Sequence, residues 1–224
     1  QRIEALREVH AAGGLKAVFE LTRGIKMPLE LGRSLGALEM TASEEGEVLR
    51  HLASPDSALA DLARGFAVAR VTKRGPGWAR ERLTTAGAAW SPAQQAECLL
   101  ALPAEPTTWD LAASLGAEAE RRYWTRLLPY GIDEGHAERA MRAFTEHGNA
   151  VAAIHLAADW AAAPGPLLAE ALERYLHTAG STPFDASLGY RIGELLDRLQ
   201  AASDVDRDRV APLEWAYLPL LRFD

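Results

Sequence analysis

The sequence predicts an all-α protein, and two observations carry that prediction. Apolar residues recur at spacings of three and four along most of the chain, as at Leu59, Leu62, Ala63, Phe66 and Ala67. This spacing is the period of an amphipathic helix. No stretch shows the alternation of apolar and polar residues that is typical of a half-buried strand.

Five helices are predicted in the first 71 residues, and each has its own boundary signal. These signals are Gly13-Gly14 after the first helix, Gly24 after the second, Pro28 in the first turn of the third, a Thr41/Glu44 capping box at the fourth and Ser54-Pro55-Asp56 before the fifth. Proline suits the first helical turn, and a capping box satisfies two backbone N–H groups at a helix start. We interpret Glu44 and Glu45 as surface charges of a first turn.

The middle of the chain is predicted to continue in the same way. Residues 73–77, Lys-Arg-Gly-Pro-Gly, form the sharpest interruption, and a helix follows them. Ser91-Pro92 begins the next helix, and Thr107 or Thr108 is expected to cap another that Gly116 closes. Trp109 and Trp124 are expected in the core.

Residues 133–178 are predicted to form two or three short helices that pack on one another. The expected ranges are 133–147, 149–160 and 164–178. Gly148 suits the left-handed position after a helix, and Asn149 suits the N-cap of the next. Ala153, Ile154 and Ala157 form a narrow apolar stripe, which predicts a closely packed neighbour.

The last part of the chain is predicted to contain a loop and two further helices. The loop covers residues 179–184, and the amphipathic helix after it carries Leu188, Ile192 and Leu199. The tail is helix-like, and Pro212 is expected to kink it or to restart it in a new first turn.

About fourteen short helices with short connections predict stacked antiparallel hairpins, with a repeat of about 30 to 40 residues. At this coarse level the pattern resembles α-helical repeat segments, of the HEAT or tetratricopeptide type, in large bacterial multidomain proteins. No family motif is matched: Trp109, Leu115-Gly116 and Tyr123 have tetratricopeptide residue types at other spacings. The resemblance implies an α-solenoid and no functional residue. The alternative is a compact, irregular helical bundle.

We expect residues 1–224 to form a single helical domain, with a sub-boundary near 73–77. The chain begins at Gln1 and ends at Asp224 directly after an apolar run, which suggests a fragment of a longer chain. A single cysteine, Cys98, favours a reducing compartment and hence a cytoplasmic location. No apolar run approaches the roughly 20 residues needed to span a bilayer, so no membrane partner is expected.

The sequence contains no catalytic, cofactor-binding or metal-binding constellation. No two of the six histidines have the i, i+4 spacing of a helical zinc site. Phosphate-binding loops and nucleophile elbows are missing. Cys98 has no neighbouring histidine or lysine and is interpreted as a buried, inert thiol.

The net charge of the chain is −7, which argues against nucleic acid as the default partner. One segment departs from this acidic character. Between residues 64 and 82 there are six basic residues against one acidic residue, Glu81. One interpretation is a contact surface for an acidic partner, with an aromatic anchor. Its candidate residues are Arg70, Lys73, Arg74, Trp78, Arg80 and Arg82. The alternative is that these cations pair with acidic side chains of the same domain.

The sequence therefore favours a non-enzymatic helical scaffold or protein-interaction segment of a larger cytoplasmic protein. Its partner would be another protein or neighbouring domains of the same polypeptide, and the oligomeric state stays open. Two alternatives remain: an all-α ligand-binding or enzymatic domain with a site between helices, and a nucleic-acid-binding solenoid that uses the segment 64–82.

Overall fold

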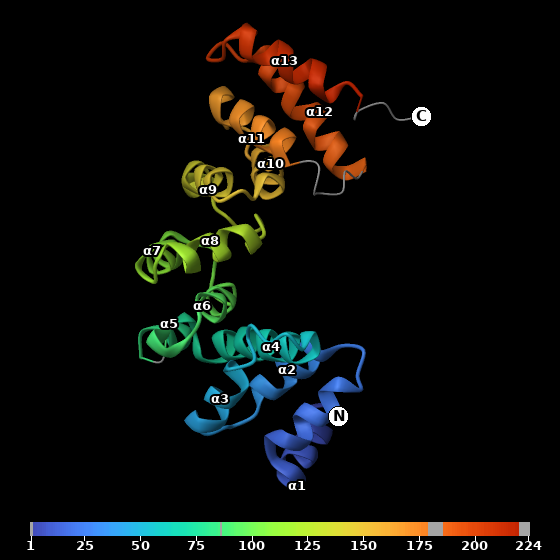
Figure 1. The fold of residues 1–224 in the computed structure, drawn as a ribbon, viewed down its shortest axis with the longest axis vertical. Coiled ribbons are helices and arrows are strands. Elements are labelled where there is room, and N and C mark those ends of the chain that lie inside the picture. The colour runs from blue at the N-terminus through green and yellow to red at the C-terminus, as the bar shows by residue number, and fades with distance from the viewer. Residues whose placement is uncertain (1, 86, 179–185, 220–224) are drawn as a thin grey trace. The chain divides into compact units, whose positions relative to one another are not determined.

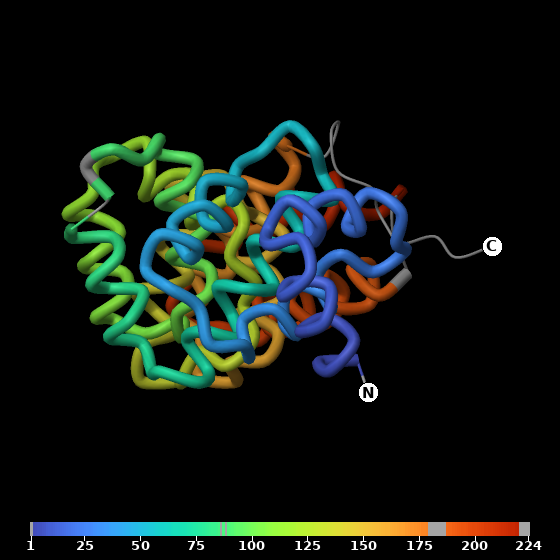
Figure 2. The backbone as a smooth tube through the Cα atoms, turned by 90° about the horizontal axis from the view of Figure 1, so that it is seen from below, coloured from blue at the N-terminus to red at the C-terminus, as the bar shows by residue number. Residues whose placement is uncertain are grey.

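The fold is all-α, as the helical periodicity predicted. The computed structural model describes residues 2–85, 87–178 and 186–219. In these ranges the chain forms thirteen α-helices and one short 3₁₀ helix, with no strand (Figure 1). The backbone trace in Figure 2 follows one coil after another between short connections. None of the described helices is both long and apolar enough to cross a membrane.

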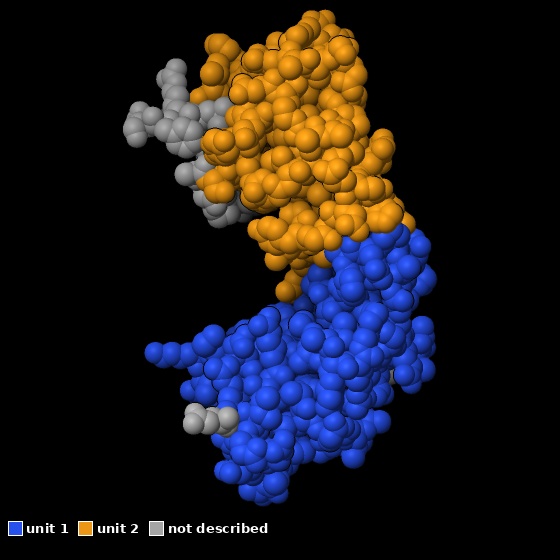
Figure 3. All heavy atoms as spheres, turned by 180° about the vertical axis from the view of Figure 1, so that it is seen from behind, with its two compact units in different colours: residues 1–123 blue, residues 124–224 orange. Residues whose placement is uncertain are grey.

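The chain divides into two compact units, residues 1–123 and 124–224 (Figure 3). The predicted sub-boundary near 73–77 lies inside the first unit. Gly75 ends the helix 57–74 with a φ of 81°. The helix that follows, 76–85, packs back on the helix 57–74, with the Phe66 and Trp78 rings 6.2 Å apart. The turn chemistry therefore marks a helix end and not a unit boundary.

The first unit contains the helices α1 to α7 and most of α8. Their bounds are α1 Arg2–Arg23, α2 Pro28–Ala37, α3 Ala42–Leu49, α4 Ser57–Arg74, α5 Pro76–Thr85, the 3₁₀ helix Gly87–Ala89, α6 Pro92–Leu99, α7 Pro106–Ser114 and α8 Ala117–Arg126. The central helix is α4, which contacts α1, α2, α3, α5 and α6. Its apolar stripe is buried at Leu62, Ala63, Phe66 and Ala67.

Helices α2 and α4 approach each other so closely that their backbones touch at glycines. A Cβ atom added to Gly32 would lie 1.9 Å from the carbonyl oxygen of Leu62. A Cβ atom added to Gly65 would lie 2.0 Å from the carbonyl oxygen of Leu29. Only glycine fits at these two positions, because any side chain would overlap backbone atoms that cannot turn away.

Most predicted boundaries of the first unit are confirmed. Pro28 lies in the first turn of α2, Thr41 and Ser91 form capping boxes at α3 and α6, and Asp56 caps α4. The two helices predicted around Gly13-Gly14 form one element, α1, with a break at Gly14, where φ is 62°.

Helix α7 begins earlier than the sequence suggested. Its N-cap is Glu105, and Pro106 occupies the first turn. The prediction of a cap at Thr107 or Thr108 was wrong because the proline already supplies a residue without an N–H group at the first helical position.

The second unit contains the end of α8 and the helices α9 Glu134–Glu146, α10 Ala150–Asp159, α11 Gly165–Thr178, α12 Ala186–Ala201 and α13 Arg207–Tyr217. Helix α10 contacts α9, α11 and α12, and α11 also contacts α13. Pro212 lies inside α13, which continues through it, so of the two predicted alternatives the restart in a new first turn does not occur. The loop predicted at 179–184 lies outside the described residues.

The predicted connection between α9 and α10 is confirmed in detail. Gly148 has a φ of 83°, and the Asn149 side chain accepts a hydrogen bond from the Ala152 N–H group. The same side chain donates to the carbonyl oxygens of Trp124 and Leu127, at 2.8 and 3.1 Å. Ala153 of α10 is fully buried, as are Ile154 and Ala157.

Candidate functional site

The first candidate site is built around Glu45 of α3. The capping box fixes the start of this helix: Thr41 Oγ1 accepts from the Glu44 N–H group at 3.3 Å, and Glu44 Oε2 accepts from the Thr41 N–H group at 2.8 Å. Glu44 is therefore the first-turn charge that the sequence suggested. Glu45 also lies in the first turn, but it is not a surface charge, since it is fully buried and contacts side chains of α4 and α5. A local signal separates these adjacent glutamates. Glu44 is the third residue after Thr41, as a capping box requires, whereas Glu45 lies three, four and seven positions before the apolar residues Val48, Leu49 and Leu52, which is the spacing of one buried helix face.

Four side chains of α4 and α5 contact the Glu45 carboxylate. Arg70 Nε and Arg74 Nη1 each lie 3.1 Å from Oε1, while Arg82 Nη2 lies 2.8 Å from Oε2. Trp78 Nε1 donates to Oε2 at 3.0 Å. We call Glu45, Arg70, Arg74, Trp78 and Arg82 the Glu45 cluster. It links three consecutive helices through one carboxylate.

Arg70 is the innermost cation of the Glu45 cluster and has no exposed side-chain surface. Burial lowers the pKa of Arg70, while the Glu45 charge raises it and the Arg74 charge lowers it. The Arg70 guanidinium also lies over the Phe66 ring, 5.1 Å from its centroid, in a cation–π contact. The arginine remains charged, because guanidinium does not lose its proton in proteins.

The structure places the six predicted contact residues in two different environments. Arg70 and Trp78 are buried, with Trp78 only 6% exposed. These two side chains therefore belong to the interior and cannot serve as a cation and an aromatic anchor on a surface. The sequence did not predict this burial. Both side chains contact the Phe66 ring and the Glu45 carboxylate instead of solvent.

The other four predicted residues reach the surface but also have partners within the first unit. Lys73 donates to the Ala37 carbonyl oxygen, and Arg80 donates to Glu105 and Thr107 at 2.8 and 2.6 Å. Arg74 and Arg82 keep 37% and 23% of their side chains exposed beside Glu45. Contact with an external partner through these four cations stays a prediction.

The described residues show no metal site and no activated thiol. Among them, no group of three or more His, Cys, Asp or Glu side chains could hold a metal ion. Cys98 of α6 is fully buried, as predicted, and burial raises its thiol pKa to about 12. A thiol in this state stays protonated at neutral pH and is a poor nucleophile.

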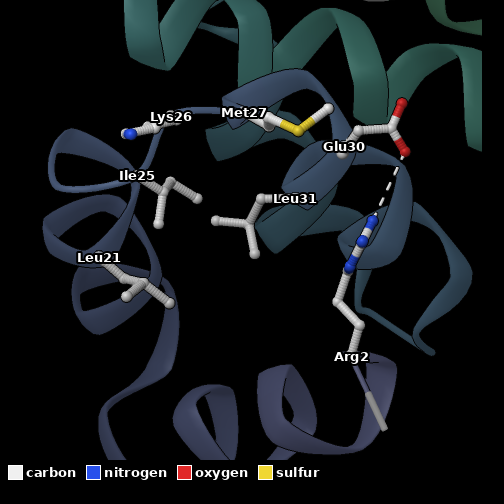
Figure 4. Close-up of a pocket in the computed structure, with 7 residues that line it drawn as sticks. All are labelled: Arg2, Leu21, Ile25, Lys26, Met27, Glu30 and Leu31. Atoms are coloured by element: carbon white, nitrogen blue, oxygen red, sulfur yellow. Dashed lines mark ion pairs between the residues drawn. The ribbon is translucent and has the colours of Figure 1, made fainter.

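The second candidate site is an apolar pocket of about 300 Å³ between the end of α1, the connection 24–27 and α2. It is lined by Arg2, Leu21, Ile25, Lys26, Met27, Glu30 and Leu31. In Figure 4 the side chains of Leu21, Ile25 and Leu31 face the hollow, and the Arg2–Glu30 ion pair of 3.7 Å closes its other side. Lys26 points away from the hollow.

A methionine, Met27, lies at the rim of the pocket. Met27 is 63% exposed and Leu21 is 39% exposed, although both line the hollow. Methionine adapts its shape to different apolar groups because it is unbranched and polarizable. Nothing in the sequence pattern pointed to this pocket, since its residues come from two helix ends and the first turn of the chain.

Searches against protein-family models, curated proteins and solved structures give no match for this chain.

Proposed function

We propose that the chain is a non-enzymatic helical scaffold that binds an apolar segment of another protein, or of a neighbouring domain, in the pocket between α1 and α2. The observation that carries this proposal is the pocket itself. Three aliphatic side chains form one wall, and Met27 stands exposed at the rim. Hot spots of protein interfaces are often large aromatic or arginine side chains that fill desolvated pockets.

The size and polarity of the pocket favour a side chain over a metabolite. Its volume of about 300 Å³ lies at the lower end of the range for small-molecule sites. Two of its three charged side chains, Arg2 and Glu30, pair with each other, which leaves few polar groups to orient a reacting molecule. Lys26 lines the pocket, but its side chain points away from the hollow, so we expect the bound segment to carry an acidic residue next to its apolar anchor.

The stacked-hairpin arrangement remains part of this proposal. Contacts in both units run mostly between helices that are neighbours or next neighbours in sequence, as in α9 to α13. Repeat proteins have this contact pattern and commonly use it to present binding surfaces.

The proposal is tested with peptides selected from a random peptide library displayed on phage and measured against the purified chain. We expect enriched peptides to carry a large apolar residue beside an acidic one. Met27→Glu should weaken their binding at least tenfold, because it places a charge at the rim of the pocket. Leu128→Glu is the matched control, since Leu128 is 65% exposed in the second unit, and should bind as the unchanged chain does.

Two results would contradict the proposal. One is a library that yields no peptide dependent on the chain. The other is a set of peptides whose affinity is equal for the unchanged chain and for Met27→Glu.

A further inference from the structure

The Glu45 cluster contains more positive than negative charge. Arg70, Arg74 and Arg82 all contact the single carboxylate of Glu45, which leaves two positive charges without a counter-charge. The neighbouring pair of Lys73 and Glu39 is neutral and does not change this balance. Arg70 is fully buried and faces Glu45, so the excess positive charge lies on Arg74 and Arg82, whose side chains are 37% and 23% exposed.

Several N–H groups of the cluster also lack an acceptor. Arg70 Nη1 and Nη2 are buried and have no hydrogen-bond partner. Arg70 Nε faces Glu45 Oε1 without hydrogen-bond geometry, and Arg82 Nε is buried without an acceptor. Glu45 Oε1, which faces Arg70 Nε and Arg74 Nη1, likewise makes no hydrogen bond. These two arginines are therefore held to the carboxylate by charge and not by hydrogen bonds of good geometry.

Two of the three arginines connect the cluster with solvent. Arg74 lies in the last turn of α4 and Arg82 lies in α5, on either side of the turn at Gly75. They approach different oxygens of the Glu45 carboxylate, and their side chains remain partly exposed. A guanidinium has five N–H donors, so both can bind a second acceptor without releasing Glu45.

We propose that the Glu45 cluster binds a divalent tetrahedral oxyanion, a phosphate, phosphate monoester or sulfate, on the solvent-facing side of Arg74 and Arg82. A dianion would balance the two uncompensated charges. Its several oxygens match the paired N–H groups of guanidinium, which bind phosphate in a bidentate manner. The buried charge of Arg70 adds attraction, because it is poorly screened by solvent.

The test is isothermal titration calorimetry with inorganic phosphate, at a pH above its second pKa, and with sulfate. We expect one anion per chain for both and no saturable heat with chloride at the same ionic strength. Thermal unfolding in millimolar phosphate should show a Tm that rises with the logarithm of the anion concentration. Low concentrations are needed because phosphate and sulfate stabilise many proteins nonspecifically when concentrated.

Variants connect the binding to the cluster. Arg74→Gln and Arg82→Gln should each weaken phosphate binding at least tenfold, and Arg74→Lys should restore part of it by restoring the charge. Arg142→Gln is the matched control, because Arg142 is an exposed arginine that pairs with Glu138 in the second unit. It should bind phosphate with unchanged affinity. If Arg82→Gln fails to fold for loss of its contact with Glu45, Arg74→Gln carries the test, since its side chain is the more exposed.

Phosphoserine distinguishes the two sources of such an anion. Binding of phosphoserine together with inorganic phosphate would assign the site to monoesters, and binding of inorganic anions alone would assign it to the free ion. The proposal is overturned if phosphate produces no saturable heat, or if its affinity is the same in Arg74→Gln as in the unchanged chain.

Discussion

At the scale of single residues, replacement of Glu45 should cost the chain much of its stability. Glu45→Gln keeps the size of the side chain but removes the charge that faces the fully buried Arg70. Removing one partner of a buried ion pair typically costs about 3–5 kcal/mol. We expect a loss of this size in the free energy of unfolding, measured by urea denaturation monitored by circular dichroism.

An exposed glutamate provides the control for Glu45. Glu118 pairs with Arg121 and Arg122 on the surface of α8, where ion pairs contribute little. Glu118→Gln should leave the unfolding midpoint almost unchanged. A loss for Glu45→Gln no larger than that for Glu118→Gln would show that Arg70 finds a substitute partner.

His51 gives the first unit a predicted dependence on pH. Burial lowers the pKa of His51 from 6.5, and the charges of Asp56 and Glu47 oppose this shift. Between the lowered folded value and 6.5, the unfolded chain holds the additional proton. The contribution of His51 to stability is therefore complete above 6.5 and decreases as the pH falls below that value.

The measurement compares unfolding free energies at about pH 7.5 and about pH 5.5, on either side of the unperturbed histidine pKa. His51→Phe keeps the edge-on ring contact with Phe19, whose centroid lies 4.9 Å away, and removes the titrating group. The unchanged chain should lose more stability on acidification than His51→Phe does. Equal losses in the two proteins would assign the pH dependence to other groups.

Among the helices, the contact between α2 and α4 should be the least tolerant of substitution. Gly32→Ala places a methyl group into the Leu62 carbonyl oxygen, so the two helices must separate. Overpacking of this kind costs about 1–3 kcal/mol or more. Chemical denaturation should show this loss.

Gly46→Ala is the matched control for Gly32→Ala. Gly46 lies inside α3, and nothing is found within 4 Å of the position of its missing Cβ atom. Alanine there should stabilise the chain by about 0.5–1 kcal/mol, because glycine has the greater freedom in the unfolded state. The contact would be misassigned if both variants changed stability in the same direction.

Helix α10 makes the corresponding prediction for the second unit. Ala153 is fully buried on a helix that contacts α9, α11 and α12. Ala153→Leu should therefore destabilise the chain by about 1–3 kcal/mol through overpacking, as measured by urea denaturation. A neutral result would mean that α10 can move outward at little cost.

The sequence predicted the helices well because their signals are local. Capping at Thr41 and Ser91 and the left-handed Gly148 depend on residues at most three or four positions away, and the structure confirms each of them. The close approach at Gly32 depends on residue 62, and a single sequence gives no information about which helices pair. The helices were thus predictable, whereas their packing was not.

The candidate sites were predicted less well for the same reason. The basic segment 64–82 was correctly noticed as an unusual charge, but Glu45, the acid that three of its arginines contact, lies on another helix. The spacing of Glu45 to Val48, Leu49 and Leu52 places it on an apolar helix face but does not show which helix packs there. Arg70 and Trp78 are buried where both contact the Glu45 carboxylate, a contact that spans more than 20 positions in the sequence. The pocket at Met27 likewise depends on Arg2, which lies about 25 positions earlier in the sequence.

At the scale of the whole chain, the division at residues 123 and 124 predicts two cooperative unfolding units. Each has its own buried core, as at Phe66 in the first and Phe144 in the second. In differential scanning calorimetry we expect the calorimetric enthalpy to exceed the van't Hoff enthalpy, which is the signature of more than one unit. Glu45→Gln should lower the transition of the first unit, and Ala153→Leu should lower the other. A single transition that both variants shift equally would show that the units unfold as one.

Cys98 makes this protein convenient for site-selective chemistry. The chain has one cysteine, and its sulfur lies in the core of the first unit with a thiol pKa of about 12. Maleimide dyes and spin labels react with exposed thiolates, so the folded chain presents no competing target. A cysteine introduced at an exposed position, as in Arg142→Cys, would carry a probe alone, without first replacing the native thiol.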